Sequence, residues 1–517
     1  MKKNIFVSIL FLLTLSSCSD SFLDQHPSGG IILQDQYSSL DGTIQSSMLG
    51  IYSLMYTNGE DHDVFGQRSI DMYGDLLCGD MAMSSSSYGW FETDERMQTS
   101  SYRRGYLWSY YYEIIRLTNK VINEIDAKHI PSGFPTVETA SNFTANDSVY
   151  AYCYGEALAM RGYAYSGLQR FFCKTVDAID MNTELSLPVY TEVDTEFDTS
   201  MGQPRSTAAD VYLRIESDLI TAIDYMTHFK GANVSRASKL EVDADVARAL
   251  LAYAYLNKGD YDNAYTQAKQ LINNANYRIL PQSQLLTTGF SDVSEESWMW
   301  GQDVSIETTT GLASFFGQVD IHTYSYAWAG DIKAIDANLQ ASIFSWDGRK
   351  NWFDSKGRPV RKFYNVKSGN STNADDIDRD WLNDNVFMRI ESIYLIAAEA
   401  AVSKSTPDLS ESRNLLKAVL DERVDTASTA QDQYNTYLLS LTTTTELIKA
   451  ITYNWRVEMW GEGYGLQTFR RLTHTVTLGS NHLRTTKDIN YTMDRMFTFE
   501  MPTSETTYNP YIGTELP

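Results

Sequence analysis

Two stretches of polar, irregular sequence carry aromatic side chains of the kind that bind sugars. They are Tyr88, Trp90 and Phe91 in the first stretch and Tyr324, Tyr326 and Trp328 in the second. A sugar ring has an apolar face that a flat aromatic ring can cover, while neighbouring polar groups bond the hydroxyls at its rim. We therefore predict a stacking platform built from Trp90 and Trp328, with the other four rings around it. The alternative is that such rings pack in the core, as we expect for Trp298 and Trp300, which alternate as in a strand.

The chain carries little that points to catalysis or to a bound metal. It has none of the common nucleophile, zinc-protease, nucleotide-binding or paired-cysteine motifs. The acidic pair Glu295–Glu296 resembles a glycosidase couple, but such pairs are common on solvated surfaces. The acidic run 375–380 opens like a calcium loop, yet Trp381 takes the glycine position and Phe387 that of the bidentate glutamate. We therefore expect a protein that is not an enzyme, with no catalytic residues, no metal and no cofactor.

Cys18 is the residue that we expect to be modified. The chain begins with two lysines, an apolar run at 5–15, and small residues directly before this cysteine. A charged start, a short apolar core and small residues at the cut are the features of a secretory signal, and the run is too short to span a bilayer. A cysteine at this place resembles a bacterial lipobox, in which the thiol is acylated and becomes the new N-terminus. We predict a signal peptide at 1–17, a lipidated tether at 18–32, and membrane attachment through the lipid alone.

The acidic balance of the chain argues against two classes of partner. The sequence has 66 acidic and 42 basic residues, which gives a formal net charge of −24. So acidic a surface repels phosphate backbones and anionic headgroups, so we expect no nucleic-acid binding and no electrostatic attachment to a membrane. Beyond the signal peptide, no stretch of the sequence is long and apolar enough to cross a membrane.

Most of the chain has the apolar periodicity of helices. Leu107, Tyr111, Ile114, Val121 and Ile125 recur at spacings of three, four and seven, which predicts one long helix. Similar stripes occupy 149–172, 207–227, 242–257, 261–273, 386–403, 409–421 and 444–460. Paired helices separated by short turns predict an all-α fold, built as an array of helical hairpins.

The helices on either side of Gly259 resemble a tetratricopeptide repeat. Ala252 is small where two helices would cross, Tyr255 is a packing residue, and Gly259 would end the first helix. Ala264 would let the second helix approach closely. Residues 392–420 resemble a degenerate second copy, with alanines on the close-packing face. Repeats of this kind need neighbours to bury their faces, so several pairs should stack into a curved scaffold.

Residues 281–385 interrupt the helical pattern. They are rich in Ser, Thr, Gly, Asp and aromatic residues, in short pieces without helical period. Long irregular segments in a compact protein are uncommon and tend to carry function. We predict a tetratricopeptide-like helical scaffold at 33–280 and 386–517, with an irregular, ligand-bearing portion at 281–385. The curvature of the scaffold could bring both aromatic stretches to one face.

Six short motifs follow one another in a fixed order along the chain. They lie at 18–24, 156–172, 187–210, 387–400, 455–472 and 501–510. Together they resemble the SusD/RagB family, the surface glycan-binding lipoproteins of Bacteroidetes, over nearly the whole length. Two motifs depart from the family pattern: Ala208-Ala209-Asp210 replaces an acidic lead, and Trp455 or Asn454 stands at the first glutamate position of the closing motif. Most matching residues are arginines, glutamates and alanines of helix ends and crossings, which predict the fold rather than the ligand.

The resemblance implies a function at the cell surface. It implies capture of oligosaccharides and their delivery to a partner TonB-dependent, SusC-like outer-membrane transporter, and some relatives take peptides. We therefore expect a non-catalytic protein that binds an oligosaccharide or polysaccharide and is lipid-anchored on the outer membrane at the cell surface. Two alternatives stay open at this point: a peptide-binding nutrient lipoprotein, and a tetratricopeptide scaffold for protein interactions in the envelope.

Overall fold

The computed structural model describes residues 43–57, 61–96, 101–129, 145–194, 202–229, 238–274, 276–286, 289–363, 381–490 and 497–512. The chain divides into two units, Met1–Ser47 and Met48–Pro517, and only residues 43–47 of the first unit are among those described. The predicted signal peptide, the tether with Cys18 and the acidic run 375–380 lie outside the described residues.

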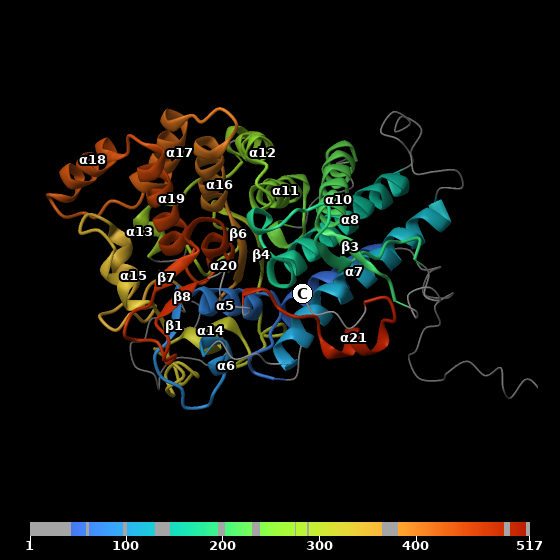
Figure 1. Ribbon diagram of the computed structural model, residues 1–517, viewed down its shortest axis with the longest axis horizontal. Helices are drawn as coiled ribbons and strands as arrows, with labels where there is room; N and C mark the ends of the chain where they lie inside the picture. Colours follow the sequence, from blue (N-terminus) through green and yellow to red (C-terminus); the bar gives the residue numbers. More distant parts are fainter. Residues whose placement is uncertain are drawn as a thin grey trace, which may run out of the picture. The chain divides into compact units, whose positions relative to one another are not determined.

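Long helices form the scaffold of the second unit (Figure 1). They are α7 (Ser101–His129), α8 (Ala145–Phe172), α10 (Ala208–His228), α11 (Ala244–Lys258), α12 (Tyr261–Asn274), α16 (Ile390–Ser403), α17 (Leu409–Asp421) and α19 (Thr444–Glu458). Each packs against the next in chain order, from α7 on α8 to α16 on α17, and α19 packs on both α16 and α17. Stacking of this kind buries one face of every helix. The predicted all-α, tetratricopeptide-like fold is confirmed.

Shorter helices connect and cover the long ones. They are α5 (Gln67–Cys78), α6 (Glu92–Glu95), α13 (Gln282–Leu285), α14 (Phe315–Val319), α15 (Ala337–Ala341), α18 (Ala430–Ser440), α20 (Gly465–Thr468) and α21 (Thr503–Tyr508). Helix α4 (Thr43–Thr57) precedes them in the chain and has 15 residues. Single turns of tighter or wider helix are η2 (Val176–Ala178), η3 (Ser238–Leu240), η4 (Gly348–Trp352) and η5 (Phe469–Thr473). Every residue of α5 is buried, so this helix lies in the interior and supports the segments that follow it.

The hairpin of α11 and α12 has the caps and contacts that its sequence predicts. Asp243 caps α11, where its carboxylate accepts the backbone N–H of Val246 at 2.9 Å. Gly259 ends the helix with φ at 80°, a left-handed conformation that residues with side chains rarely adopt. Ala252 and Ala264 are fully buried, so small side chains let the two helices approach closely.

The second predicted repeat pairs α16 with α17, but α16 begins later than its apolar stripe indicates. Its alanines Ala397, Ala398 and Ala400 are fully buried, as the repeat requires. The stripe predicted a helix from residue 386, whereas the structure begins α16 at Ile390. The preceding residues form strand β6 (Asn385–Arg389), because they pair with the distant strand β4 (Trp298–Gln302). Long-range backbone pairing here overrides the local pattern.

Strands are few and short in the described part of the chain. They form antiparallel two-stranded ladders, namely β4 with β6, β1 (Met81–Met83) with β5 (Lys333–Ile335), β2 (Leu185–Pro188) with β3 (Arg205–Thr207), and β7 (Thr475–Thr477) with β8 (Asp488–Asn490). Trp298 and Trp300 on β4 are buried, so their predicted place in the core is confirmed. The β1–β5 ladder joins two segments that lie far apart in the sequence, and it positions the candidate site.

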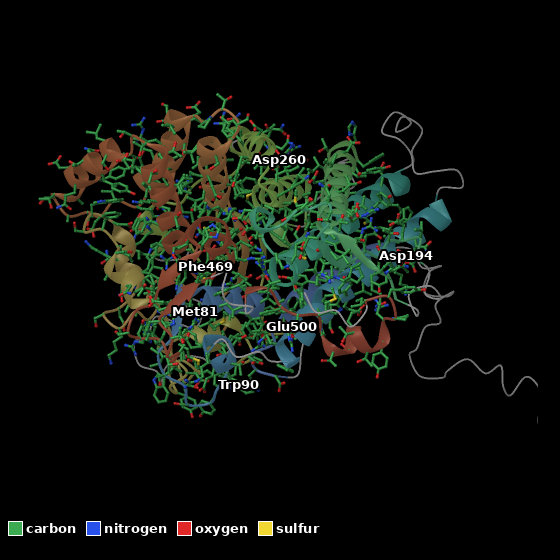
Figure 2. All side chains as sticks on the ribbon, in the orientation of Figure 1. Met81, Trp90, Asp194, Asp260, Phe469 and Glu500 are labelled. Atoms are coloured by element: carbon green, nitrogen blue, oxygen red, sulfur yellow. The ribbon has the colours of Figure 1, made fainter. Side chains whose placement is uncertain are left out.

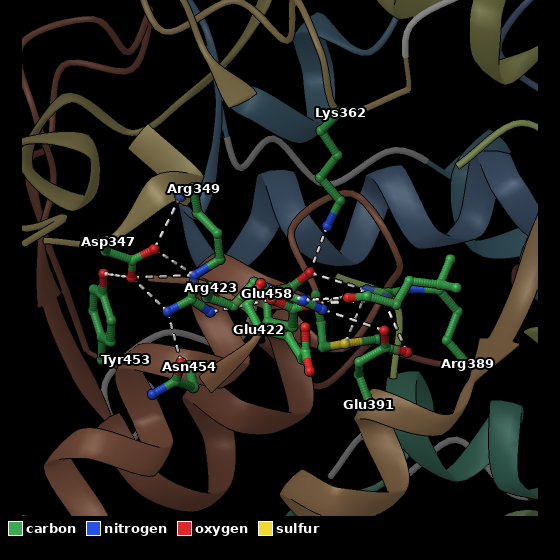
Figure 3. A network of polar contacts seen from close by, with 12 residues as sticks. Asp347, Arg349, Lys362, Arg389, Glu391, Glu422, Arg423, Tyr453, Asn454 and Glu458 are labelled. Carbon is green, nitrogen blue, oxygen red and sulfur yellow. Dashed lines mark hydrogen bonds and ion pairs between the residues drawn. The ribbon is translucent and has the colours of Figure 1, made fainter. Parts of the chain in front are cut away.

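A network of buried charges lies beside α16 and α19 (Figure 3). Glu458 of α19 is at its centre, where Arg423 bonds both carboxylate oxygens at 2.8 and 2.9 Å. Arg349 and Arg389 approach the same carboxylate at 3.2 and 3.3 Å. All four side chains are fully buried. The further partners of the three arginines are Asp347, Glu391, Asn454 and Glu462, and Lys362 pairs with Glu462. We call this set the buried charge network.

Basic partners hold the pKa of two carboxylates of the network low despite their burial. Burial raises the pKa of Glu391 and lowers the pKa of Lys362 to about 8. Burial alone would raise the pKa of Glu458, but the charge and hydrogen bonds of Arg423, together with Arg389 and Arg349, lower it below its usual value. The pKa of Glu462 is lowered against the same burial effect by Arg389 and Lys362. A buried ion that loses its partner costs several kcal/mol, so the members of this network depend on one another.

Candidate binding site

Six rings form a continuous row beside the β1–β5 ladder. They are, in order of contact, Trp328, Tyr324, Tyr88, Tyr326, Trp90 and His62, and we call them the aromatic surface. Centroid distances are 4.9 Å for Trp328–Tyr324, 5.3 Å for Tyr88–Tyr326 and 6.0 Å for Trp90–Tyr326. Tyr88 and Tyr324 share a hydrogen bond, which raises the pKa of the Tyr88 phenol. The structure therefore brings the two predicted stretches together.

The rings of the aromatic surface differ in how far they reach solvent. Tyr88, Tyr324 and Trp328 are 56%, 46% and 50% exposed, whereas Trp90, Tyr326 and His62 are half-buried. Exposed aromatic side chains that lie side by side make this surface a candidate for binding. Figure 2 shows Trp90 at the lower margin of the view, beyond Met81 of β1. The half-buried rings anchor the row, and the exposed rings are available to a ligand.

Phe91, which the sequence placed in the platform, does not reach this surface. Its side chain is 1% exposed and packs against Tyr73 of α5 with ring centroids 5.2 Å apart, and against Phe65 at 6.0 Å. The backbone of Phe91 has a φ of 68°, a left-handed conformation that turns the chain from the exposed loop into α6. This turn directs the ring inward, so the structure assigns Phe91 to the core beneath the aromatic surface.

Backbone pairing joins the two aromatic segments. The β1–β5 ladder continues past the strands, where the N–H of Ser84 donates to the carbonyl of Ile332 at 2.9 Å. The N–H of Ile332 donates in turn to the carbonyl of Ser85 at 3.1 Å. The chain leaving β1 therefore runs beside the chain entering β5. A pair of short strands, rather than the curvature of the helical scaffold, makes this contact.

A buried carboxylate fixes the loop that carries Tyr88 and Trp90. Asp331 is fully buried, and its Oδ1 accepts the backbone N–H groups of Ser87 and Tyr88 at 2.6 and 2.8 Å. Its Oδ2 accepts the N–H of Trp90 at 3.2 Å. Hydrogen bonds to an ionised acceptor are stronger than those between neutral groups. Asp331 therefore positions the rings of the first segment from within the second.

Charged side chains beneath the aromatic surface pair with one another. Arg103 of α7 bonds Asp94 of α6 at 2.9 Å and Asp63 at 2.7 Å. Lys333 of β5 donates to Gln318 at 2.6 Å, and burial lowers its pKa to about 7. Gln318 also donates to the backbone carbonyl of His62, so these buried groups hold residues of the aromatic surface in place.

His62 is a member of the aromatic surface that the sequence did not reveal. Its imidazole stacks on Trp90, with centroids 5.4 Å apart and ring planes at 16°. Its Nδ1 lies 2.7 Å from the hydroxyl of Tyr326. His62 precedes α5 between two aspartates, and neither apolar period nor an aromatic neighbour marks it there. Only the folded chain places it beside Trp90.

The acidic pair Glu295–Glu296, which the sequence offered as a possible catalytic couple, has ordinary structural partners. Glu295 accepts a hydrogen bond from Gln284 and Glu296 pairs with Arg278, each at 2.5 Å, so the two carboxylates serve separate contacts. Within the ranges that the structure describes, no group of three or more His, Cys, Asp or Glu residues could hold a metal ion. None of the helices in those ranges has the length and apolar character needed to span a membrane.

Known families match the chain over most of its length. A SusD-like family model described as starch-binding and associating with the outer membrane matches residues 35–251, and a model of the SusD family matches residues 334–512. A SusD-like protein of Bacteroides ovatus is 23% identical over 446 residues, which cover 80% of this chain and 74% of that protein. The chain belongs to the SusD/RagB family.

Solved structures of the SusD superfamily share this fold. A SusD-like carbohydrate binding protein from Bacteroides vulgatus has a TM-score of 0.70 at 20% identity, covering 91% of this chain and 97% of that one. A SusD superfamily protein from Bacteroides thetaiotaomicron has a TM-score of 0.71 at 22% identity, covering 91% and 98%. Surface glycan-binding protein A from Bacteroides fluxus has a TM-score of 0.61 at 16% identity, covering 92% and 98%. At these identities the similarity establishes the fold.

Many residues of the SusD-like motifs lie in the interior of the protein, and none is part of the aromatic surface. Arg389, Glu458 and Glu462 are motif residues, and all three belong to the buried charge network. Trp455 or Asn454 stands where the SusD pattern has glutamate, and the indole N–H of Trp455 donates to Glu399 at 2.8 Å. Arg471 pairs with the same Glu399 carboxylate, so the indole N–H adds a hydrogen bond to an existing ion pair. The motif residues hold the fold, as their helix-end and crossing positions predicted.

Proposed function

We propose that this protein is a non-catalytic binding protein for an oligosaccharide or polysaccharide. The observation that carries the proposal is the aromatic surface, because three of its six rings are exposed and every ring contacts the next. Each ring can cover the apolar face of a sugar, and the tyrosine hydroxyls can bond the rim. A row of rings suits a chain of sugar units better than one small molecule.

Relatives with the same fold support a carbohydrate as the ligand. The structures from B. vulgatus and B. fluxus are described as carbohydrate-binding and glycan-binding proteins. We propose that Trp328, Tyr324 and Tyr88 form the exposed part of the binding platform, with Trp90 and Tyr326 as its anchored part. The ligand-bearing face then draws on both 281–385 and the end of β1, rather than on 281–385 alone.

We propose further that the protein acts on the outer membrane beside a transporter. Its matched family model is described as associating with the outer membrane, and Cys18 follows a lipoprotein-type signal in the sequence. Lipid on Cys18 would hold the protein at the cell surface, where it delivers captured glycan to a TonB-dependent, SusC-like transporter. Replacement of Cys18 by Ala should leave uncleaved precursor and abolish lipid labelling. Labelling that persists in this variant would contradict the assignment.

Affinity electrophoresis tests the ligand class. The wild-type protein is run in native gels that contain soluble starch, xylan, pectic galactan or mucin glycans, and in parallel it is titrated with casein peptides. Retardation by at least one polysaccharide, and its reduction in Trp328→Ala, is the expected result. Binding of peptides without retardation by any polysaccharide would replace the proposal with a peptide-binding protein. Binding of neither, with tight capture of one envelope protein, would favour an interaction scaffold.

A further inference from the structure

His62 closes the half-buried end of the aromatic surface. Its imidazole stacks on Trp90 at 16° and meets the edge of Tyr326 at 85°, with centroids 5.4 and 5.5 Å away. Its backbone carbonyl accepts the side-chain amide of Gln318 at 2.9 Å, and Gln318 also accepts the ammonium of Lys333. Contacts from the ring and from the backbone therefore hold His62 in place.

The two ring nitrogens of His62 have different surroundings. Nδ1 lies 2.7 Å from the hydroxyl of Tyr326, so one nitrogen is already committed to a hydrogen bond. Nε2 has no hydrogen-bond partner among the residues that the structure describes, and it is not among the buried unpaired polar atoms. The ring is half-buried, so Nε2 is the polar atom that His62 presents to solvent beside Trp90.

The bond to Tyr326 fixes what Nε2 can do. When the phenol donates to Nδ1, the neutral imidazole carries its proton on Nε2, which then donates. When Nδ1 donates to the phenol oxygen, Nε2 accepts. In both tautomers Nε2 offers one hydrogen bond directed in the plane of the imidazole, which lies nearly parallel to the Trp90 ring on the face that His62 stacks against. A sugar hydroxyl both donates and accepts, so it matches Nε2 in either state.

We propose that Nε2 of His62 binds a rim hydroxyl of the sugar that stacks at the Trp90 end of the aromatic surface. This inference rests on the proposed function and adds a specificity-determining residue to it. Stacking alone tolerates any sugar with an apolar face, whereas a positioned hydrogen bond selects a hydroxyl at one place on the ring. The ligand class is therefore a glycan with a free hydroxyl at that position.

Substituting His62 by asparagine or by glutamine distinguishes the roles of its two ring nitrogens. In His62→Asn the amide reaches roughly the place of Nδ1 and can still bond Tyr326, but nothing replaces Nε2. In His62→Gln the amide reaches roughly the place of Nε2. Both variants lose the stacked ring equally, so each controls for the other. Dissociation constants are measured by titration with soluble starch and with every other polysaccharide that retards the wild-type protein, and melting temperatures show that both variants fold.

The expected result is a loss of about fivefold to tenfold in affinity for His62→Asn and of about twofold or less for His62→Gln, because a net hydrogen bond is worth roughly 0.5–1.5 kcal/mol. Equal affinity of both variants, whether unchanged or equally weakened, overturns the inference. Trp328→Ala separates this failure from that of the proposed function. If Trp328→Ala weakens binding and His62→Asn does not, the platform stands without His62. If wild-type protein binds none of the polysaccharides, both proposals fail.

Discussion

The buried charge network and the aromatic surface use side chains in opposite ways. In the network, Arg349, Arg389 and Arg423 converge on Glu458, and every one of these charges is enclosed and paired. At the aromatic surface the charges lie underneath, where Asp331 and Arg103 bond neighbouring groups, and uncharged rings face outward. The chain uses its buried charges to fix the fold and leaves its rings for contact. Arg389, Glu458 and Glu462 of the network lie in the family motifs, and the aromatic surface lies outside them.

The difference has an energetic consequence. A buried ion that loses its partner costs about 3–5 kcal/mol of stability, because the remaining charge stays desolvated. A half-exposed ring contributes little to stability but roughly 1–2 kcal/mol to binding. Substitutions in the two regions should therefore separate stability from affinity, and the size of each effect tests the distinction.

Removal of the central charge of the network should have the largest effect. Glu458→Gln keeps the shape of the side chain but leaves three guanidinium groups around a neutral amide. We expect a loss of about 3–5 kcal/mol of stability, measured by thermal or urea unfolding, with unchanged affinity per folded molecule. Glu296→Gln is the matched control, because its pair with Arg278 is more than half exposed and should cost at most about 1 kcal/mol. Equal melting temperatures for the two variants would contradict the role of the network.

Asp331 joins the two kinds of region, since it is a buried charge that holds exposed rings. Asp331→Ala leaves three backbone N–H groups without their acceptor, which should cost about 1–3 kcal/mol of stability and displace Tyr88 and Trp90. Affinity for glycan should fall together with stability, and Asp331→Asn should restore part of both. Affinity electrophoresis and melting curves measure the two effects. A variant that melts early but binds normally would show that the loop does not contribute to the site.

Within the aromatic surface, substitutions of Trp328 and of Trp90 should differ in their effect on stability. Trp328 is 50% exposed, so Trp328→Ala should weaken glycan binding by about tenfold, roughly 1–2 kcal/mol, and leave stability within about 0.5 kcal/mol. Trp90 is half-buried against His62 and Tyr326, so Trp90→Ala should weaken binding and also lower the melting temperature. Titration and thermal unfolding of both variants measure this contrast. If Trp328→Ala destabilises the fold as much as Trp90→Ala does, its ring is a packing residue.

Substitution of His482 should have the smallest effect on stability, and that effect should depend on pH. Its Nδ1 lies 2.9 Å from Glu95 of α6 and its Nε2 lies 3.2 Å from Asp336, which caps α15. Burial alone would lower the pKa of His482, and nearby Arg484 also lowers it, but the hydrogen bonds to Asp336 and Glu95 raise the pKa above its usual value. Both nitrogens face carboxylates, so the charged form fits this place, with Arg456–Asp80 as the neighbouring ion pair.

The sign of the pH dependence follows from the raised pKa. The contribution of His482 is complete below the pKa of the unfolded state, near 6.5, and is lost as the pH rises through the higher pKa of the folded state. The melting temperature of wild-type protein should therefore decline above neutral pH more steeply than that of His482→Gln. His228→Gln, at an exposed pair with Asp224, is the control and should follow the wild type. Parallel curves for wild type and His482→Gln would contradict this role.

The helical scaffold could be predicted because its information is local. Apolar residues at helical spacing, Asp243 before α11 and Gly259 after it describe a helix and its two ends within one short stretch. The start of α16 could not be predicted in the same way. Residues 386–389 belong to an apolar stripe, and only the pairing of β6 with β4 makes them part of a strand.

The arrangement of the aromatic surface could be predicted from the sequence only in part. The sequence by itself determined that two irregular stretches carry clustered aromatic residues and that the long helices form the scaffold. Tertiary structure alone decided that Asp331 ties these stretches together, that Phe91 turns inward, and that His62 stacks on Trp90. Helical periodicity repeats every few residues and can be read locally. Contacts between residues 62, 90 and 326 arise only when distant segments pair, and no local spacing encodes them.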